Sequence, residues 1–149
     1  MKVRHKARGF LVHRDELLLL RRGWPGGEPY CTAVGGSVEP GDADIEAALR
    51  REALEEIGAT LGPAAEVLTL TEDSGATVVV QHFFLARVLT LDAGLRHGPE
   101  FADPDLGEFT LLRTPLTASA VTSLNLQPPE AAAFASTHIA TWSSREGTQ

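Results

Sequence analysis

The segment 35–58 constrains the possible fold and chemistry of this 149-residue chain more than any other segment. A glycine pair precedes a stretch of helix-favouring residues, and a further glycine follows it. Within the stretch, Glu52, Glu55 and Glu56 recur at positions i, i+3 and i+4, so a helix would place their side chains next to one another. Exposed like charges at this spacing repel by roughly 0.2–0.5 kcal/mol per pair. The pattern therefore predicts a compensating charge, and a divalent cation that prefers oxygen ligands is the simplest candidate.

The helix should begin near residues 42–44, where an acidic side chain can accept hydrogen bonds from free backbone amides. It should end at Gly58, because glycine commonly follows the last helical turn. At about 100° per residue, the carboxylates form one arc that borders the apolar stripe, with Glu56 nearest the core. Arg51 lies one turn before Glu55 and can pair with it. Glutamate-rich helical faces are usually only solvated, so the functional interpretation depends on Arg51 and the glycines.

Composition predicts a folded chain. Hydrophobic residues make up 43% and charged residues 22%, which suits one domain over residues 1–149. The single cysteine, Cys31, excludes an internal disulfide, so we expect a reducing, cytoplasmic location. The charged N-terminal residues are not followed by an apolar stretch typical of a signal peptide, and we expect no membrane span.

Charge is distributed unevenly along the chain. The net charge is −7, yet residues 1–22 contain seven Lys and Arg against two acidic residues. The overall sign argues against a general nucleic-acid binder, while a local basic edge could still meet a phosphate ligand. Arg21 and Arg22 end an expected strand and offer forked donors that suit a diphosphate, with solvent exposure as the equal alternative. The basic segment as a whole is equally consistent with a solvated edge strand.

Outside this helix, short apolar runs bounded by turn residues predict strands, and two further helices follow near the C-terminus. The run 77–89 is largely apolar on both faces and should be a central strand. The polar segment 92–107 predicts a long loop, which is more often functional than idle. The expected strands are 8–12, 16–20, 30–34, 66–71, 77–89 and 108–113, and the expected helices are 117–124 and 129–140.

Residues 36–59 resemble the Nudix box. That motif reads Gly, five residues, Glu, seven residues, Arg-Glu, an apolar residue, any residue, Glu-Glu, any residue, Gly and an apolar residue. Residues 51–59, Arg-Glu-Ala-Leu-Glu-Glu-Ile-Gly-Ala, match its second half. The first half departs from it, because Asp42 stands in the place of Glu and eight residues, not seven, separate it from Arg51. Val34 also occupies the place of a frequent proline.

The resemblance implies an α/β fold, specifically an α/β/α sandwich around a mixed β-sheet. It also implies a hydrolase that cleaves a pyrophosphate bond in a nucleoside diphosphate linked to another group, with Mg²⁺ or Mn²⁺ as cofactor. On this chain, Glu52, Glu55 and Glu56 would be metal ligands, with the Gly36 carbonyl as a further candidate. Arg51 would orient the glutamates. Asp42 would be either a partner of this cluster or an ordinary helix cap.

Other residues are candidates for catalysis and substrate binding. Glu52 is the first candidate for the general base that activates the attacking water, followed by Glu100 in the expected loop and Glu108 at the start of the last strand. For Glu100, an ordinary solvated loop acid is the favoured interpretation. Tyr30 is a candidate to stack on a nucleobase, as part of a substrate site with the two strand-end arginines. His82 alternates with apolar residues and is expected to be a satisfied core histidine.

Alternatives to this hydrolase remain open at the level of sequence. The altered spacing and Asp42 would also suit a nucleotide-binding module that has lost efficient catalysis. Some family members catalyse isomerisation, but no further motif for it is present. Oxidised nucleotides, nucleoside diphosphate sugars, dinucleoside polyphosphates and capped RNA are all open as substrates. The expected hairpin and C-terminal helix offer surfaces for a homodimer, and we expect no membrane partner.

Overall fold

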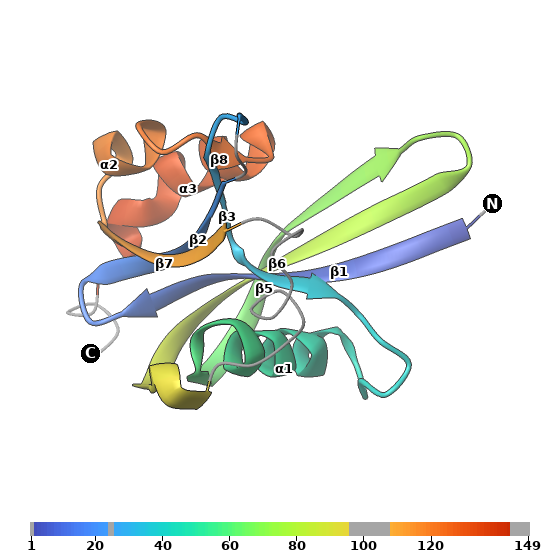
Figure 1. Cartoon of the computed structure of the whole chain (residues 1–149), viewed down its shortest axis with the longest axis horizontal. Helices are drawn as coiled ribbons and strands as arrows, with labels where there is room; N and C mark the ends of the chain where they lie inside the picture. The colour runs from blue at the N-terminus through green and yellow to red at the C-terminus, as the bar shows by residue number, and fades with distance from the viewer. Residues whose placement is uncertain (1, 24–25, 96–107, 144–149) are drawn as a thin grey trace.

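The computed structural model describes residues 2–23, 26–95 and 108–143, whose strands and helices are drawn in Figure 1. The strands are β1 (Lys2–His13), β2 (Glu16–Gly23), β3 (Tyr30–Thr32), β4 (Val34–Ser37), β5 (Ala59–Asp73), β6 (Thr77–Leu91), β7 (Glu108–Pro115) and β8 (Leu126–Gln127). The helices are α1 (Ile45–Ile57), α2 (Ala118–Thr122) and α3 (Pro129–His138), with short 3₁₀ helices at Ala93–Leu95 and Ile139–Trp142.

The described strands form one mixed sheet with the order β5-β6-β1-β2-β3-β8, to which β4 and β7 add by pairing with β1 and β2. Strands β1 and β2 form the predicted hairpin, with Leu11 opposite Leu18. Strand β1 pairs in parallel with β6 from Lys2 to Val12, and from Lys6 to Gly9 it also pairs with β4. From Lys6 onward β1 therefore lies between β6 on one side and β4 and β2 on the other, so the edge-strand alternative is wrong for this part of the basic segment. Residues 2–5 pair with β6 alone and are exposed, which agrees with that alternative.

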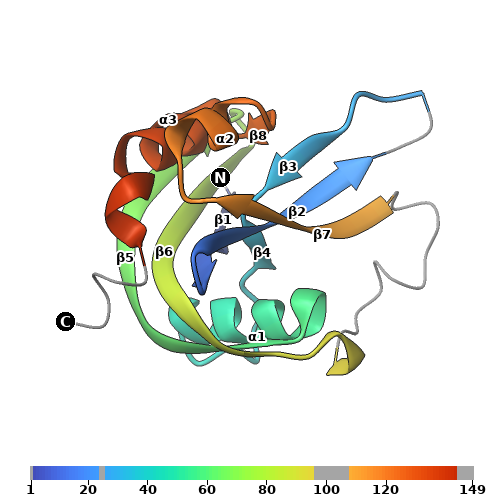
Figure 2. The ribbon, with the colours of Figure 1, turned by 90° about the vertical axis from the view of Figure 1, so that its left-hand side faces the viewer.

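Helices cover both faces of the sheet, which confirms the expected α/β/α arrangement. Figure 2 shows α1 against one face, with α2 and α3 against the other. Successive strand residues point to opposite faces, so Leu18 and Leu20 pack in the core under α1 while Leu17 and Leu19 pack in the core under α3. This explains the uninterrupted leucine run, because a strand covered on both faces is apolar at every position. Each buried leucine contributes roughly 1.5–3 kcal/mol.

Helix α1 begins and ends as predicted. The Asp44 carboxylate accepts the backbone N–H of Ala47 at 2.7 Å, which caps the N-terminus. Gly58 follows the last turn with φ of 70°, in the left-handed region. A β-carbon at Gly58 would overlap the carbonyl oxygen of Asp92, so both conformation and space require glycine there.

Strands β5 and β6 are longer than the sequence pattern indicates. They pair from Ala59 opposite Leu91 to Asp73 opposite Val78, with register shifts between Thr60 and Ala64. Those irregularities accommodate Pro63, which has no backbone N–H to donate. Strand β6 lies between β5 and β1, so its predicted central position is confirmed.

Two further predicted segments differ from the structure or lie partly outside the described residues. The expected strand 30–34 is divided into β3 and β4, which are separated by Ala33. Of the expected loop 92–107, residues 96–107 lie outside the described residues, as do residues 24–25 and 144–149. None of the described helices is both long enough and apolar enough to cross a membrane.

Candidate active site

Two carboxylates of α1 lie against the glycine pair of β4. Glu52 and Glu56 are 9% and 5% exposed, on the side of the helix that faces the sheet. Glu56 Oε1 accepts the backbone N–H of Gly35 at 2.9 Å. A β-carbon at Gly36 would lie 2.9 Å from the Glu52 carboxylate carbon and 3.0 Å from both its oxygens. The glycines are needed here because they let acidic side chains approach the backbone of β4.

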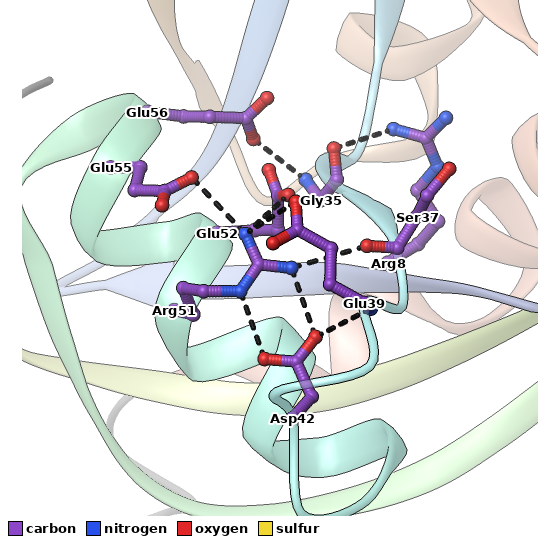
Figure 3. A network of polar contacts seen from close by, with 9 residues as sticks. All are labelled: Arg8, Gly35, Ser37, Glu39, Asp42, Arg51, Glu52, Glu55 and Glu56. Atoms are coloured by element: carbon purple, nitrogen blue, oxygen red, sulfur yellow. Dashed lines mark hydrogen bonds and ion pairs between the residues drawn. The ribbon is translucent and has the colours of Figure 1, made fainter. Parts of the chain in front are cut away.

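Arg51 is the centre of the polar network drawn in Figure 3. Its Nη1 donates to Glu52 Oε1 at 2.9 Å and to Glu55 Oε2 at 3.2 Å, so the predicted pairing with Glu55 is confirmed. Its Nη2 donates to the Ser37 carbonyl oxygen at 3.1 Å, which links the helix to the end of β4. A forked guanidinium thus holds two glutamates in fixed positions.

Asp42 binds the other edge of the same guanidinium. Arg51 Nε donates to Asp42 Oδ1 at 2.9 Å and Nη2 donates to Oδ2 at 3.0 Å. Asp42 also accepts the backbone N–H of Glu39 at 2.8 Å. Hydrogen bonds from Arg51 and then from this amide lower the pKa of Asp42, and the bonds to Asp42 raise the pKa of Arg51. Of the two sequence alternatives, Asp42 is the partner of the cluster, and the helix cap is Asp44.

A second arginine approaches the glycine pair from β1. Arg8 Nη1 donates to the Gly35 carbonyl oxygen at 3.0 Å and Nε donates to Gln81 Oε1 at 3.2 Å. Burial lowers the pKa of Arg8, while the charges of Glu56 and Glu52 act in the opposite direction. Sequence reasoning placed Arg8 only within a basic segment. The signal that could have identified it is a basic residue at the start of an apolar strand.

Acidic groups outnumber basic ones around the glycine pair. Four carboxylates contact Arg51, a fifth, that of Glu56, accepts the Gly35 amide, and the charges of Glu52 and Glu56 also act on Arg8. Carboxylate and carbonyl oxygens are the ligands that Mg²⁺ and Mn²⁺ take, so the donor chemistry fits a divalent ion. The carboxylates are Glu39, Asp42, Glu52, Glu55 and Glu56.

The predicted ligands are gathered but do not converge on one point. Across the described ranges, no three acidic, histidine or cysteine side chains form a ready metal cluster. The reason is visible in the contacts, because Arg51 lies between Glu52 and Glu55 while Glu56 is turned to the Gly35 amide. Mg²⁺ usually keeps several waters and takes only one or two carboxylates with substrate phosphates, so full convergence is not required.

The two predicted substrate arginines lie on different faces of β2. Arg22 is opposite Tyr30 in β3 and Phe109 in β7, and its guanidinium carbon lies 4.1 Å from the Phe109 ring centroid. That stacking orients a flat cation beside the α1 face of the sheet, since Phe109 packs against the core under α1. Arg21 is exposed and lines a separate cavity of about 320 Å³ with residues near α2. Strand register thus puts Tyr30 opposite Arg22, and Tyr30 also lines the cavity of Arg21, while the two arginines themselves lie on opposite faces.

The remaining residues considered from the sequence are Glu100, Glu108 and His82. Glu100 lies outside the described residues. Glu108 begins β7 opposite Gly23, next to the Arg22 position. His82 bonds to Glu66 Oε2 at 2.9 Å and to His5 Nδ1 at 3.0 Å, so it is satisfied as expected. Its place is a half-buried face of the sheet and not the core, which corrects that part of the expectation.

Known families and solved structures include proteins that are similar to this chain. A family model described as NUDIX domain matches residues 3–119. A search of curated proteins finds no match. Solved structures below 25% identity share the fold. The solution structure of the E. coli ORF135 protein is 21% identical, covers 97% of this chain and 94% of its own, and has a TM-score of 0.63.

Two further structures extend this likeness. The MutT NUDIX hydrolase from Burkholderia pseudomallei is 23% identical, with 78% of this chain and 85% of that chain covered and a TM-score of 0.56. An ADP compounds hydrolase is 19% identical, with 80% and 60% covered and a TM-score of 0.62. At these identities the likeness supports the fold alone.

Proposed function

The chain belongs to the NUDIX domain family, and on that premise we propose that it is a divalent-metal-dependent pyrophosphohydrolase. Its substrate would be a nucleoside diphosphate linked to another group, cleaved at the pyrophosphate bond. The observation that carries the proposal is the position of Glu52, Glu55 and Glu56, side by side on α1 beside the glycine pair of β4. Acidic groups exceed basic ones there, and a cation would relieve that excess.

The residues that would hold the ion are Glu52, Glu55 and Glu56, with the Gly36 carbonyl as a further candidate. Mg²⁺ or Mn²⁺ at this place would neutralise charge on phosphate oxygens and make water more acidic. Arg51 keeps the side chains of Glu52 and Glu55 in place through direct hydrogen bonds. The Gly35 amide does the same for Glu56.

In this proposal, residues at the end of β2 and in the neighbouring strand β3 position the substrate. Arg22 would donate to diphosphate oxygens from a planar guanidinium that stacks on the Phe109 ring. Tyr30, its neighbour across the strands, would contact the nucleoside part. Glu52 is our first candidate to take the proton of the attacking water, because it is the glutamate next to Gly36; Glu100 and Glu108 are the other two.

A nucleotide-binding module without efficient turnover is the alternative function. The extra residue before Arg51 and the presence of Asp42 in the place of Glu are the sequence features that suggest this alternative. The two hydrogen bonds between Asp42 and Arg51 speak against it, because they show that the shorter acid still anchors the arginine. Catalysis is therefore the function that the site supports better.

Glu→Gln variants test the proposal, because they keep side-chain volume and remove the charge. We expect Glu52→Gln and Glu56→Gln each to reduce turnover by orders of magnitude on a panel of nucleoside diphosphate derivatives with Mg²⁺ or Mn²⁺. Glu46→Gln is the matched control, since Glu46 lies on the same helix but pairs with Arg50 instead. Phosphate or pyrophosphate release measures turnover. Equal rates in all variants would remove these carboxylates from the mechanism.

A further inference from the structure

A small cavity lies on the face of the sheet opposite α1. Its volume is about 200 Å³, and its lining includes Lys6 and Arg8 from β1, Gln81 from β6 and Gln127 from β8. Lys6 and Arg8 are two residues apart in a strand and so project to the same face. Gln81 is in register with Lys6 across the parallel pair.

The Lys6 ammonium group has no hydrogen bond or ion pair among the described residues, and Glu72 is the one carboxylate whose charge acts on it. The residue is nevertheless half-buried. Burial, and then the charge of Arg8, lowers the pKa of Lys6, and the charge of Glu72 opposes that shift only in part. An ammonium group that is partly removed from water without a partner is unfavourable, so an anionic ligand would stabilise it.

The other polar side chains of the cavity are the amides of Gln81 and Gln127 and the hydroxyl of Thr32. Arginine has no acceptor atom, so the bond from Arg8 Nε fixes the Gln81 oxygen toward Arg8 and turns its NH₂ group away. Gln127 Nε2 already donates to Asn125 Oδ1 at 2.8 Å. Two cations therefore line this cavity without a carboxylate in its lining, and its neutral acceptors are the Thr32 hydroxyl and the Gln127 side-chain oxygen.

The cavity is also close to the catalytic carboxylates. Arg8 donates to the Gly35 carbonyl, and the Gly35 amide donates to Glu56, so a single residue of β4 separates the two sites. Figure 3 shows this sequence of contacts through Gly35. Of the described strands, only β1 pairs with β4, so the other edge of β4 is not covered by a strand.

We propose that this cavity is an anion subsite, which binds a phosphate or carboxylate group on the part of the substrate beyond the cleaved diphosphate. The inference rests on the proposed hydrolase function for its substrate. Size favours a small charged group, because pockets for drug-sized molecules are usually about 300–1,000 Å³. The one aromatic residue in the described lining, Phe83, is only 1% exposed, so the lining has no open ring on which a nucleobase could stack.

Matched pairs of diphosphates test the subsite and distinguish the two anions. Coenzyme A and dephospho-coenzyme A differ by one phosphate, and UDP-glucuronic acid and UDP-glucose differ by one carboxylate. Titrations in EDTA, followed by NMR of the backbone and of the Gln81 side-chain amide, measure binding without turnover. We expect the more anionic member of at least one pair to bind roughly tenfold more tightly, because it gains a charge-assisted hydrogen bond.

Variants of Lys6 connect that preference to the cavity. Lys6→Met should remove the preference, and Lys6→Arg should retain it, which also guards against a folding defect in the first variant. Lys2→Met is the matched control, because Lys2 is on the same strand but outside this cavity. Equal binding of both members of each pair, or an unchanged preference in Lys6→Met, would overturn the subsite.

The outcome for the subsite is separate from the outcome for the hydrolase. Turnover of the same compounds with Mg²⁺ is measured by phosphate release on the unmodified chain. A Lys6-dependent preference without any turnover would retain the subsite and reject the hydrolase. Turnover without any preference would retain the hydrolase and reject the subsite.

Discussion

Asp42 and Arg51 are joined by two hydrogen bonds, from Nε to Oδ1 at 2.9 Å and from Nη2 to Oδ2 at 3.0 Å. Asp42 stands one residue farther from Arg51 than the family pattern places its acid, and its side chain is shorter. The loop before α1 absorbs both differences. As a result, the remaining edge of the guanidinium is turned toward Glu52 and Glu55.

Removal of the Asp42 charge should therefore loosen Arg51 and reduce activity. We expect Asp42→Asn to lower kcat by roughly tenfold, since a charge-assisted pair is replaced by weaker neutral bonds. Asp44→Asn is the control, because asparagine caps a helix about as well as aspartate and Asp44 does not contact Arg51. Steady-state kinetics on the same substrate compare the two variants. An equal effect of both would show that the Asp42–Arg51 pair has no particular role.

The same pair predicts a dependence of stability on acid pH. The pKa of Asp42 is lower in the folded chain, so its contribution to stability is fully present above the unfolded value of about 3.9. The contribution is lost as pH falls through the folded pKa. We expect the Tm difference between the unmodified chain and Asp42→Asn to be constant above about pH 5 and to vanish in stronger acid. A difference that does not change with pH would contradict this assignment.

Gly36 is predicted to be essential for the position of Glu52. A β-carbon at Gly36 would press on the Glu52 carboxylate at 2.9–3.0 Å, so Gly36→Ala should displace that side chain. We expect a loss of activity of about tenfold or more with little change in Tm, because the carboxylate end can move at low cost. Gly41→Ala is the control, since a β-carbon there has no neighbour within 4 Å. Similar activity in both variants would indicate that Glu52 need not stay in place.

Gly58 is predicted to matter for stability. Its φ of 70° and the overlap of a β-carbon with the Asp92 carbonyl act together in Gly58→Ala. Gly75→Ala isolates the first effect, because Gly75 has φ of 92° and no neighbour within 4 Å. We expect about 1–2 kcal/mol of destabilisation for Gly75→Ala and clearly more for Gly58→Ala in urea unfolding. Equal losses would mean that the backbone at Asp92 adapts without cost.

Arg22 and Arg21 are adjacent in β2, so substitutions of the two residues can be compared to locate the diphosphate. Arg22 stacks on Phe109 on the α1 face of the sheet, whereas Arg21 lies on the other face. We expect Arg22→Lys to raise KM by about tenfold, because lysine cannot make forked bonds to a diphosphate. Arg21→Lys should leave KM unchanged. The reverse result would place the diphosphate on the opposite face of β2.

Local features of this protein could be derived from residues close together in the chain. The i, i+3, i+4 spacing of Glu52, Glu55 and Glu56, the acidic start of α1 and its end at Gly58 depend on a single helix. The leucine run of β2 likewise shows that the strand is covered on both faces. Such features follow from backbone periodicity and capping, which operate over a few residues.

By itself, the sequence determined which acidic residues gather on α1, where that helix starts and stops, and which strands are buried. Only the tertiary structure decided that Arg8 reaches Gly35 from the far face, that Asp42 holds Arg51, and that the Lys6 ammonium group has no hydrogen bond among the described residues. The full lengths of β5 and β6 also came from pairing between them. The physical reason is that these contacts join side chains from separate elements, and their distances depend on sheet register and helix docking, which no local pattern specifies.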